Sequence, residues 1–399
     1  MTNSASEAQL NRLQSQLSIA LVAGEASGDL LGSRLLSGLR MELPDARMHG
    51  IGGPHMAECG FVSEWPMDKL TVRGLFEVIP RYREIKGIQN ALRDQLLTEK
   101  PAVFIGVDYP GFNLGLEMQL KAAGIKTMHF ISPQIWAWRG GRIKKIAKAV
   151  THMLVVFPFE EAIYRQAGIP VTYVGHPLAE VIPMVPDVVA ARLALGLPST
   201  ASVVAILPGS RMSELKYNTA AFIGAAKLLA QRDRSLHFVV PMAGDKQRQY
   251  FIGLLKQAGL DDVPIHLLDG QSHVALAAAD AVLVASGTAS LEVALFKKPM
   301  VIAYRMMRAS WEIMRHMGYQ PWIGLPNILA QDFLVPELLQ DAASPQALAD
   351  AIWKQLEDQP HRAMLQQRFT EMHHSLLRNT SHESAQAVMK VIGQPLHGI

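Results

Sequence analysis

Two glycine turns in the second half of the 399-residue sequence combine residue types that suit anion binding. LPGSR and ASGTASLE each end an apolar run and are followed at once by helix-forming residues. The N–H groups and dipole of a helix that begins at such a turn attract phosphate, and an arginine beside it can pair with phosphate oxygens. These turns predict a diphosphate site made of Gly209, Ser210, Arg211, Ser286, Gly287, Thr288 and Ala289.

Glu292 follows the second turn within the same predicted helix. At that position a carboxylate could accept hydrogen bonds from a ribose diol. The simpler interpretation is an ordinary junction of strand and helix, with Arg211 at the surface and Glu292 in solvent. Both interpretations stay open on the residues alone.

Carboxylates follow two apolar runs in the first half of the chain. Glu25 lies in LVAGEASGD, a turn in which Ser27 or Asp29 could cap the next helix. Asp108 lies in GVDYPGFN and is interpreted either as a helix cap or as a functional group. His129, at the end of another predicted strand, is a candidate acid–base group or phosphate contact, with an ordinary structural histidine as the alternative.

Aromatic and apolar residues in two further segments suggest contact with an acceptor or a lipid. SPQIWAWRGGR holds Trp136, Trp138 and Arg139 in a pattern that makes an inefficient core, although packing remains the alternative. The segment from Leu70 to Gly87 mixes Leu75 and Phe76 with basic residues. It is predicted to lie at a bilayer interface, with an amphipathic core helix as the alternative.

Several other chemistries lack their motifs in this sequence. It contains no HExxH pair, no cysteine cluster, no P-loop and no GxSxG elbow, so we expect no metal and no cofactor. The net charge of +3 does not suggest a nucleic-acid partner. Cys59 is the only cysteine, which favours a reducing compartment. The apolar stretch from Val274 is interrupted by charge and a glycine turn and is not expected to span a membrane.

These residues need a scaffold that places the ends of strands together. Strand-like runs alternate with helix-like segments, first from LSIALVA to VTYVG and again from SVVAILPG to PMVIAY. This alternation predicts an α/β protein with two Rossmann-like βα domains that face each other across a cleft. HPLAEVIPMVPD, from His176, is predicted to link them. The expected domains are residues 17–183 and 184–372, and a helical segment, 373–399, is expected to return to the first.

The chain resembles the lipid-A-disaccharide synthases from about residue 17 to residue 392. The resemblance rests on motifs that occur there in the same order: LVAGEASGD, GIGGP, GVDYPGFN, ISPQIWAWRGGRI, PFE, VGHPL, LPGSR, LLDG, ASGTASLE and LPNILA. SPQIWAW and the pair LPGSR and SGTASLE are highly specific in combination. The resemblance covers essentially the whole globular chain.

The resemblance implies a GT-B fold and an inverting, metal-independent glycosyl transfer. A 2,3-diacylglucosamine unit would move from UDP to the 6-hydroxyl of 2,3-diacylglucosamine 1-phosphate, giving the β-1,6-linked lipid A disaccharide 1-phosphate and UDP. The N-terminal domain would hold the acceptor and the C-terminal domain the UDP-sugar. Where Gly111 stands, the family often carries an acid, so Asp108 is the only carboxylate of its turn here.

The resemblance also assigns residues to roles. Glu25 and Asp108 would be catalytic. For the general base that removes a proton from the acceptor's 6-hydroxyl, Asp108 is the first candidate, Glu25 the second and His129 the third. Arg211, the SGTASLE turn with Glu292, and Asn327 would bind the UDP-sugar. The acceptor and lipid side would include Ser27, Leu75, Phe76, Trp136, Trp138 and Arg139.

Two other functions would also use the glycine turns. One is a UDP-sugar epimerase, and the other is a non-catalytic protein that binds a lipid or a nucleotide. For the transferase, the expected location is peripheral, on the cytoplasmic face of the inner membrane of a Gram-negative bacterium. The sequence leaves the oligomeric state open, with a homodimer among the options.

Overall fold

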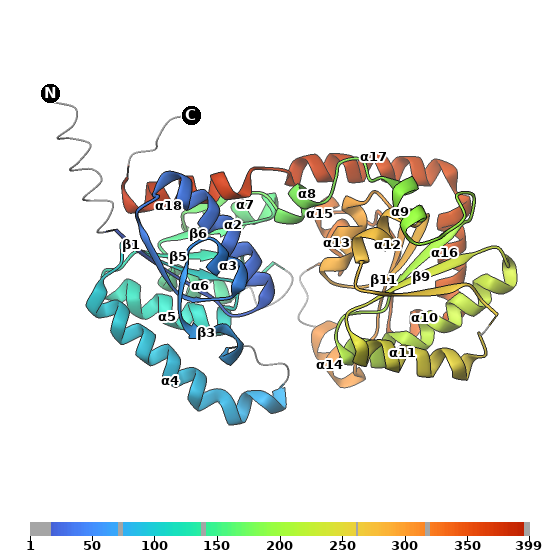
Figure 1. The fold of residues 1–399 in the computed structure, drawn as a ribbon, viewed down its shortest axis with the longest axis horizontal. Helices are drawn as coiled ribbons and strands as arrows, with labels where there is room; N and C mark the ends of the chain where they lie inside the picture. Colours follow the sequence, from blue (N-terminus) through green and yellow to red (C-terminus); the bar gives the residue numbers. More distant parts are fainter. Residues whose placement is uncertain (1–16, 71–74, 137–140, 261, 316–319, 395–399) are drawn as a thin grey trace. The chain divides into compact units, whose positions relative to one another are not determined.

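The structure, a computed structural model, describes residues 17–70, 75–136, 141–260, 262–315 and 320–394, without the side chains of residues 75–82, 313 and 314. The chain divides into two compact units, each built on its own sheet (Figure 1). Unit 1 runs to Pro177 and resumes at Leu376, and unit 2 runs from Leu178 to Ser375.

Unit 1 is built on a seven-stranded parallel sheet in the order β3-β2-β1-β4-β5-β6-β7. The central strands are almost entirely apolar, because helices cover both faces of a parallel sheet. The strands are β1 Ser18–Ala23, β2 Arg47–Gly52, β3 Val62–Pro66, β4 Val103–Val107, β5 Thr127–Phe130, β6 His152–Val155 and β7 Val171–Tyr173.

The helices of unit 1 form a layer on each face of this sheet. α2, α3 and α18 pack together on one face, while α4, α5 and α6 pack on the other. The helices are α2 Ala26–Glu42, α3 Pro54–Glu58, the 3-10 helix η1 Met67–Lys69, α4 Leu75–Glu99, α5 Pro110–Ala122, α6 Arg142–Ala149, α7 Pro158–Gln166 and α18 Thr380–Ile392. α8, Pro177–Val181, begins where unit 1 ends.

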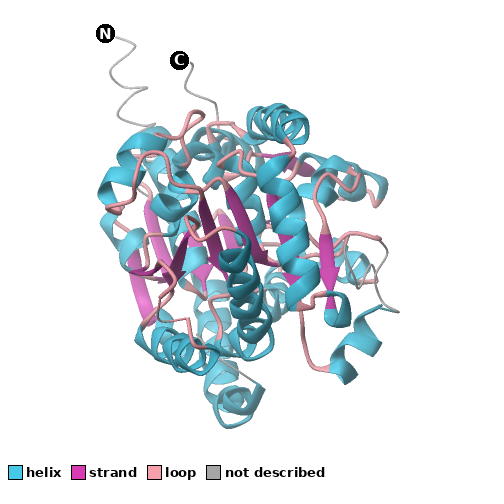
Figure 2. Ribbon diagram, turned by 90° about the vertical axis from the view of Figure 1, so that its right-hand side faces the viewer, coloured by secondary structure: helices cyan, strands magenta, loops and turns pink. Residues whose placement is uncertain are grey.

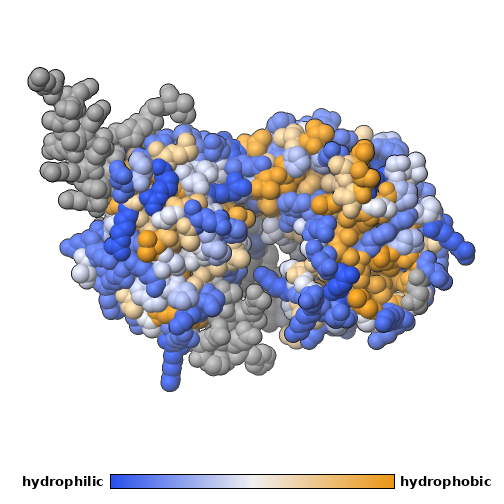
Figure 3. Space-filling model, viewed as in Figure 1, coloured by the Kyte–Doolittle hydropathy of each residue, from blue (hydrophilic) through white to orange (hydrophobic). Residues whose placement is uncertain are grey.

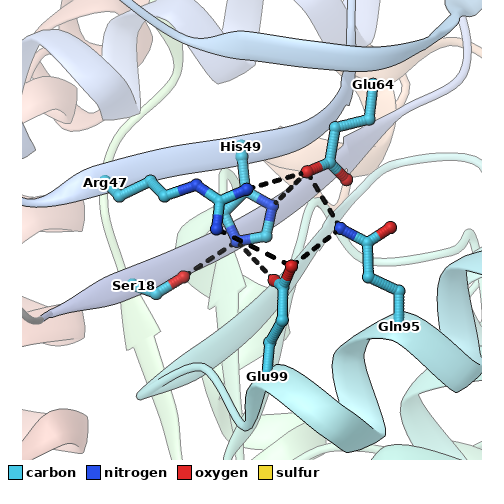
Figure 4. Close-up of polar contacts among 6 residues, drawn as sticks. All are labelled: Ser18, Arg47, His49, Glu64, Gln95 and Glu99. Carbon is cyan, nitrogen blue, oxygen red and sulfur yellow. Dashed lines mark hydrogen bonds and ion pairs between the residues drawn. The ribbon is translucent and has the colours of Figure 1, made fainter.

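The apolar pattern of the sequence predicts neither β2 nor β3, and a polar cluster explains why. β2 carries Arg47 and His49, and His49 is fully buried. Figure 4 shows that the polar side chains around it engage one another at the amino ends of β1 and β2. We call the six residues of this figure the amino-edge cluster: Ser18, Arg47, His49, Glu64, Gln95 and Glu99.

Every member of the amino-edge cluster has a partner within it. The His49 ring nitrogens lie 3.0 Å from Glu64 Oε1 and 2.8 Å from Ser18 Oγ. Gln95 Nε2 donates to Glu64 at 3.0 Å and to Glu99 at 2.9 Å. Arg47 Nη2 lies 3.1 Å from Glu64. Because the side chains of Arg47 and His49 have these partners, β2 can lie inside the sheet although it carries polar residues.

Unit 2 is built on a six-stranded parallel sheet in the order β10-β9-β8-β11-β12-β13. The strands are β8 Val203–Leu207, β9 His237–Met242, β10 Ile265–Asp269, β11 Ala281–Ala285, β12 Met300–Tyr304 and β13 Glu337–Leu339. The first five coincide with apolar runs of the sequence. β13 has only three residues, and no apolar run of the sequence predicts it.

Helices also cover both faces of the second sheet (Figure 2). α10, α11 and α16 pack together, as do α9 with α12 and α13 with α15. The helices are α9 Val188–Ala194, α10 Met212–Arg232, α11 Asp245–Ala258, α12 Ser272–Ala278, α13 Thr288–Leu295, α14 Arg308–Arg315, α15 Leu325–Ala330, the 3-10 helix η2 Gln340–Ala342, α16 Pro345–Glu357 and α17 Gln359–Leu376.

The last helix, α18, belongs to unit 1 and packs against α2, as the sequence predicts. A Cβ atom at Gly38 of α2 would lie 3.1 Å from the Cβ of Ala385, so the absent side chain lets the two helices approach closely. Lys126 Nζ donates to the Val391 carbonyl at 2.7 Å. The prediction of two Rossmann-like βα domains is thus confirmed.

Candidate functional site

Each sheet has one point where the strand order reverses, and the predicted site residues follow those strands. In unit 1 the reversal lies between β1 and β4, where Ala23 pairs with Val107. In unit 2 it lies between β8 and β11, where Leu207 pairs with Val284. Ligands of such sheets bind outside the carboxyl ends of the strands at this switch point. Both groups of predicted residues therefore lie where the topology favours a ligand.

The turn after β4 holds two consecutive non-glycine residues in the left-handed region. Asp108 has φ 50° and Tyr109 has φ 46°. Such residues are uncommon, and strain of this kind gathers at functional sites. The buried Asn113 amide donates to the Asp108 carbonyl at 2.8 Å, and the Asp108 amide donates to Phe130 at 2.9 Å. The backbone around Asp108 is therefore fixed from both sides.

The side chain of Asp108, unlike its backbone, is not held by hydrogen bonds within the described residues. α5 is capped at Tyr109, without a side-chain hydrogen bond, so Asp108 is not the helix cap that the sequence left as an alternative. Among the described residues, no hydrogen bond or ion pair reaches its half-buried carboxylate. A carboxylate in this state is free to accept a proton from a ligand.

Glu25 lies just beyond β1 and is exposed, as is Ser27. The Tyr109 ring lies over Gly24, where a Cβ atom would be 2.6 Å from its Cδ1. Burial raises the pKa of Tyr109, and the negative charge of Glu25 raises it further. Glu25 and the strained turn therefore share one electrostatic environment.

Asp29, one of the two residues that could have capped α2, does not cap that helix. Its buried carboxylate accepts hydrogen bonds from the amides of Gly53, His55 and Met56 at 2.8 to 3.0 Å. These amides surround the start of α3, so Asp29 caps that helix instead. The GIGGP turn is thereby fixed to the LVAGEASGD turn.

His129, the third candidate for the base, lies within β5 and is fully buried. Its Nδ1 atom lies 2.7 Å from Glu117 Oε1, and Glu117 is fully buried as well. Burial raises the pKa of Glu117, an effect that His129 partly offsets. The imidazole has no exposed surface to offer an acceptor, so this candidate is corrected to an interior residue.

Trp136 also lies in the interior, contrary to its expected place on the acceptor side. It is 7% exposed, and its indole N–H donates to Glu160 Oε1 at 3.1 Å. Burial raises the pKa of Glu160 to about 7. Trp138 and Arg139 lie outside the described residues, as do the side chains of Leu75 and Phe76 at the start of α4.

In unit 2, the LPGSR turn is occupied by a carboxylate of its own helix. Glu214 Oε2 accepts hydrogen bonds from the amides of Ser210 at 2.9 Å and Arg211 at 3.2 Å. These are amides that the sequence assigned to a phosphate. The Arg211 side chain is 77% exposed, and its closest carboxylate contact is with Glu214 at 3.8 Å. The guanidinium is therefore the group of this turn that an anion can reach directly.

The SGTASLE turn is open by comparison. Gly287 precedes α13 with φ 143° and forms no side-chain cap. Gly287 and Thr288 are exposed, and within the described part of the chain no acceptor is found for the amides of Gly287, Thr288 and Ala289. Uncapped amides at a helix start are suited to bind an anion.

Glu292, one turn into α13, has a neighbour that the sequence did not single out. His273 Nε2, from the first turn of α12, lies 3.3 Å from Glu292 Oε2. The His273 ring also contacts Phe296 edge-on, with 5.3 Å between ring centroids. His273 comes four residues after the end of β10, and that position is the only signal of it in the sequence.

Asn327, expected on the UDP-sugar side, is fully buried, and its side-chain nitrogen donates to the Val335 carbonyl and to Glu337 at 2.9 and 2.8 Å. Its side-chain oxygen accepts from the Val335 amide at 3.0 Å. The side chain thus ties α15 to β13 and has no exposed surface in this structure.

No group of three or more His, Cys, Asp or Glu residues in the described part of the chain is arranged to hold a metal ion. Within the same residues, no helix is long and apolar enough to cross a bilayer.

Comparisons with known proteins support one family. A family model described as lipid-A-disaccharide synthetase matches residues 19–392. The lipid-A-disaccharide synthase of Aromatoleum aromaticum is 52% identical over 376 residues, covering 94% of this chain and 96% of that protein. The corresponding enzyme of Azoarcus is 53% identical over 371 residues, covering 93% of this chain and 95% of its own.

One solved structure shows the fold at low identity. The UDP-GlcNAc 2-epimerase of Neisseria meningitidis, bound to UDP-GlcNAc, has a TM-score of 0.58 and 12% identity, over 94% of this chain and 98% of its own. The likeness shows a shared GT-B architecture. The family match, at much higher identity, decides against the epimerase and the non-catalytic protein that the sequence left open.

Proposed function

The chain belongs to the lipid-A-disaccharide synthase family, a family of glycosyltransferases in lipid A biosynthesis, and from this we propose its specific reaction. The enzyme transfers 2,3-diacylglucosamine from UDP to the 6-hydroxyl of 2,3-diacylglucosamine 1-phosphate. The products are the β-1,6-linked disaccharide 1-phosphate and UDP. A single displacement at the anomeric carbon inverts its configuration.

The observation that carries this proposal is the unengaged carboxylate of Asp108 on a strained, well-anchored turn. The attacking 6-hydroxyl must lose a proton as its oxygen bonds to the anomeric carbon, and Asp108 accepts that proton. The fixed backbone holds the carboxylate in one place, which keeps the cost of orienting it low. Glu25, exposed at the adjacent strand end, is the second candidate for the same role.

The unit 2 turns hold the UDP portion of the donor. The open amides before and within the first turn of α13 donate to the diphosphate, and the helix dipole favours its charge. Arg211 pairs with the phosphate charge that grows as UDP leaves, so it stabilises the transition state more than the ground state. Glu292 accepts hydrogen bonds from the ribose diol, with His273 beside it.

Gly111 bears on how many carboxylates this reaction uses. A Cβ atom at Gly111 would meet no atom within 4 Å, so there is room for a side chain at this exposed position. Because none is present, the turn offers one carboxylate. We propose that one base suffices.

We also propose that the enzyme works at the cytoplasmic face of the inner membrane, because both substrates carry acyl chains. The start of α4, with Leu75 and Phe76, is the proposed contact. Leu75→Glu and Phe76→Glu should lower association with anionic vesicles and leave UDP affinity unchanged. Normal vesicle association in both variants would remove this part of the proposal.

The reaction itself is tested by mass spectrometry with both acylated substrates. The expected product has the mass of the acylated disaccharide 1-phosphate, and it forms with an equal amount of UDP. A UDP-hexosamine without acyl chains serves as the control donor and should give neither disaccharide nor epimer. Folded protein that binds UDP but yields no disaccharide would overturn the proposal.

A further inference from the structure

A cavity of about 480 Å³ lies in unit 2 beside the amino ends of two strands. It is bordered by Asp280, which precedes β11, and by Pro299, which precedes β12. The LPGSR and SGTASLE turns follow the carboxyl ends of strands in the same sheet. The cavity is therefore separate from the proposed nucleotide site.

Three basic side chains line the cavity: Lys297, Lys298 and Arg362. The two lysines follow α13, and Arg362 lies on α17, whose Gln366 and Thr370 line the same wall at successive turns. Lys297 has φ 58°, a left-handed conformation that a non-glycine residue rarely adopts. Two adjacent lysines line one cavity at this bend of the chain.

Neither lysine has a carboxylate partner within 4 Å among the described residues. Lys297 Nζ lies 2.6 Å from His373 Nδ1. His373 Nε2 lies 2.7 Å from the Ala179 carbonyl, which can only accept, so Nε2 carries the hydrogen and Nδ1 accepts from the lysine. Lys298 Nζ donates to the Ala277 carbonyl at 2.9 Å. Both ammonium groups keep N–H donors for another partner.

Asp280, the one carboxylate lining the cavity, is engaged elsewhere. It accepts from Arg192 at 2.7 Å and from the Val203 amide at 2.8 Å. Its distance to Arg362 is 3.9 Å. The lining residues therefore hold three positive charges against one carboxylate that Arg192 already neutralises.

Burial makes these positive charges costly without an anion. It lowers the pKa of Lys297 and of Lys298 to about 8. An anion in the cavity would stabilise the charged amines. The two lysines, which have no carboxylate partner among the described residues, thus favour a negatively charged ligand.

Apolar side chains also line part of the cavity, and they restrict the kind of ligand that would fit. Met184, Val185, Val188 and Phe296 line the cavity. Val185 is 85% exposed, and Figure 3 shows apolar surface on unit 2 around α12 and α13. The ligand should combine an anionic group with an apolar body.

We propose that this cavity binds a phosphate monoester carried on an apolar body, with Lys297, Lys298 and Arg362 around the phosphate. A phosphate monoester carries nearly two negative charges and offers three acceptor oxygens, which suits three cationic groups better than a single carboxylate does. A soluble phosphate ester and a lipid phosphate share this chemistry.

Calorimetric titration with hexyl phosphate and with inorganic phosphate tests the proposal. Hexyl phosphate should bind about tenfold more tightly, because its chain contacts the apolar walls. Lys298→Met and Arg362→Gln should each weaken its binding about tenfold, since each removes a charge-assisted contact. Both variants should keep transferase activity.

Lys227→Met is the matched control. Lys227 Nζ also donates to a carbonyl at a helix end, that of Ala258 at 2.7 Å, but it does not line the cavity. Its loss should leave hexyl phosphate binding unchanged. Vesicles with and without phosphatidic acid distinguish a lipid phosphate from a soluble phosphate ester. If phosphatidic acid vesicles sediment the parent protein but not Lys298→Met, the ligand is a lipid phosphate. If the parent and Lys298→Met sediment equally with both kinds of vesicle, the ligand is a soluble ester.

Two results would overturn the proposal. One is the absence of saturable hexyl phosphate binding by the folded parent protein. The other is binding that persists unchanged in both cavity variants, because such binding would come from another site, including the nucleotide turns.

Discussion

Unit 1 contains two pairs of carboxylates at opposite ends of the same sheet, and they differ in how they are engaged. Glu64 and Glu99, at the amino ends, are held by His49, Arg47 and Gln95 (Figure 4). Glu25 and Asp108, at the carboxyl ends, have no described hydrogen-bond partner for their side chains. Paired carboxylates stabilise a fold, whereas unpaired ones near the surface are available to a ligand.

The two turns of unit 2 repeat this contrast with donors in place of acceptors. The amides of the LPGSR turn donate to Glu214. The amides at the start of α13 have no acceptor among the described residues. The second turn is therefore ready for an anion, while the first offers its arginine. In both units, we assign catalysis or ligand binding to groups that the fold itself does not hold by close hydrogen bonds.

The sharpest test of the contrast is Asp108→Asn. If Asp108 is the base, turnover should fall by about 10²–10⁴-fold while UDP affinity and the unfolding midpoint stay unchanged. Asp187→Asn is the matched control, because Asp187 is a true helix cap that accepts from the Ala190 amide at 2.9 Å. Asparagine replaces such a cap well. Turnover of Asp108→Asn within a few-fold of the parent would exclude the role.

The opposite result is expected at the other end of the sheet. His49→Leu removes a buried partner of two carboxylates and should lower the free energy of unfolding by about 2–3 kcal/mol, measured by urea denaturation. Turnover per folded molecule should stay within about twofold. A selective loss of turnover, with stability intact, would contradict the division between the two ends.

Measurements of UDP affinity test the proposed ligand contacts of unit 2. Arg211→Ala and Glu292→Ala should each weaken UDP binding about tenfold in calorimetric titration, because each removes a charge-assisted contact. The Arg211 effect should shrink as salt rises, since that side chain is exposed. Unchanged affinity in both folded variants would contradict the assignment of UDP to these turns.

The smallest expected effect is that of Glu214→Gln. Removing this negative charge should tighten UDP binding about threefold at low salt and cost α10 about 0.3–1 kcal/mol of stability. Glu371→Gln is the matched control, because Glu371 also faces an arginine three residues away, Arg368 at 4.0 Å. Weaker UDP binding in Glu214→Gln would show that the carboxylate orders the turn for its ligand.

The sequence predicts most of the fold because both sheets are parallel and their central strands are apolar runs. It fails at β2, where Arg47 and His49 interrupt the apolar run and contact Glu64 on β3 and Glu99 on α4, far along the chain. Such pairing cannot be read from local pattern. It also fails at β13, whose three residues are too few for a pattern.

The candidate site is predicted in part. The turns follow from glycine and apolar pattern, and topology places them at the switch points. The burial of Asn327 could not be predicted, because it depends on Val335 and Glu337. The Glu214 cap had a signal, a glutamate at the third position of a helix. That signal alone does not predict the cap, because the residue before the helix is Arg211 and not the serine or threonine of a usual capping box.

The packing of α18 on α2 has a consequence for the order in which the protein matures. Most of unit 1 leaves the ribosome first, yet α18, the helix of the same unit that fits against Gly38, is translated after the whole of unit 2. Domains generally fold as they emerge, so one flank of α2 must wait for α18 through most of synthesis. During that wait, the apolar surface that α18 will cover is open to chaperones or to another nascent chain.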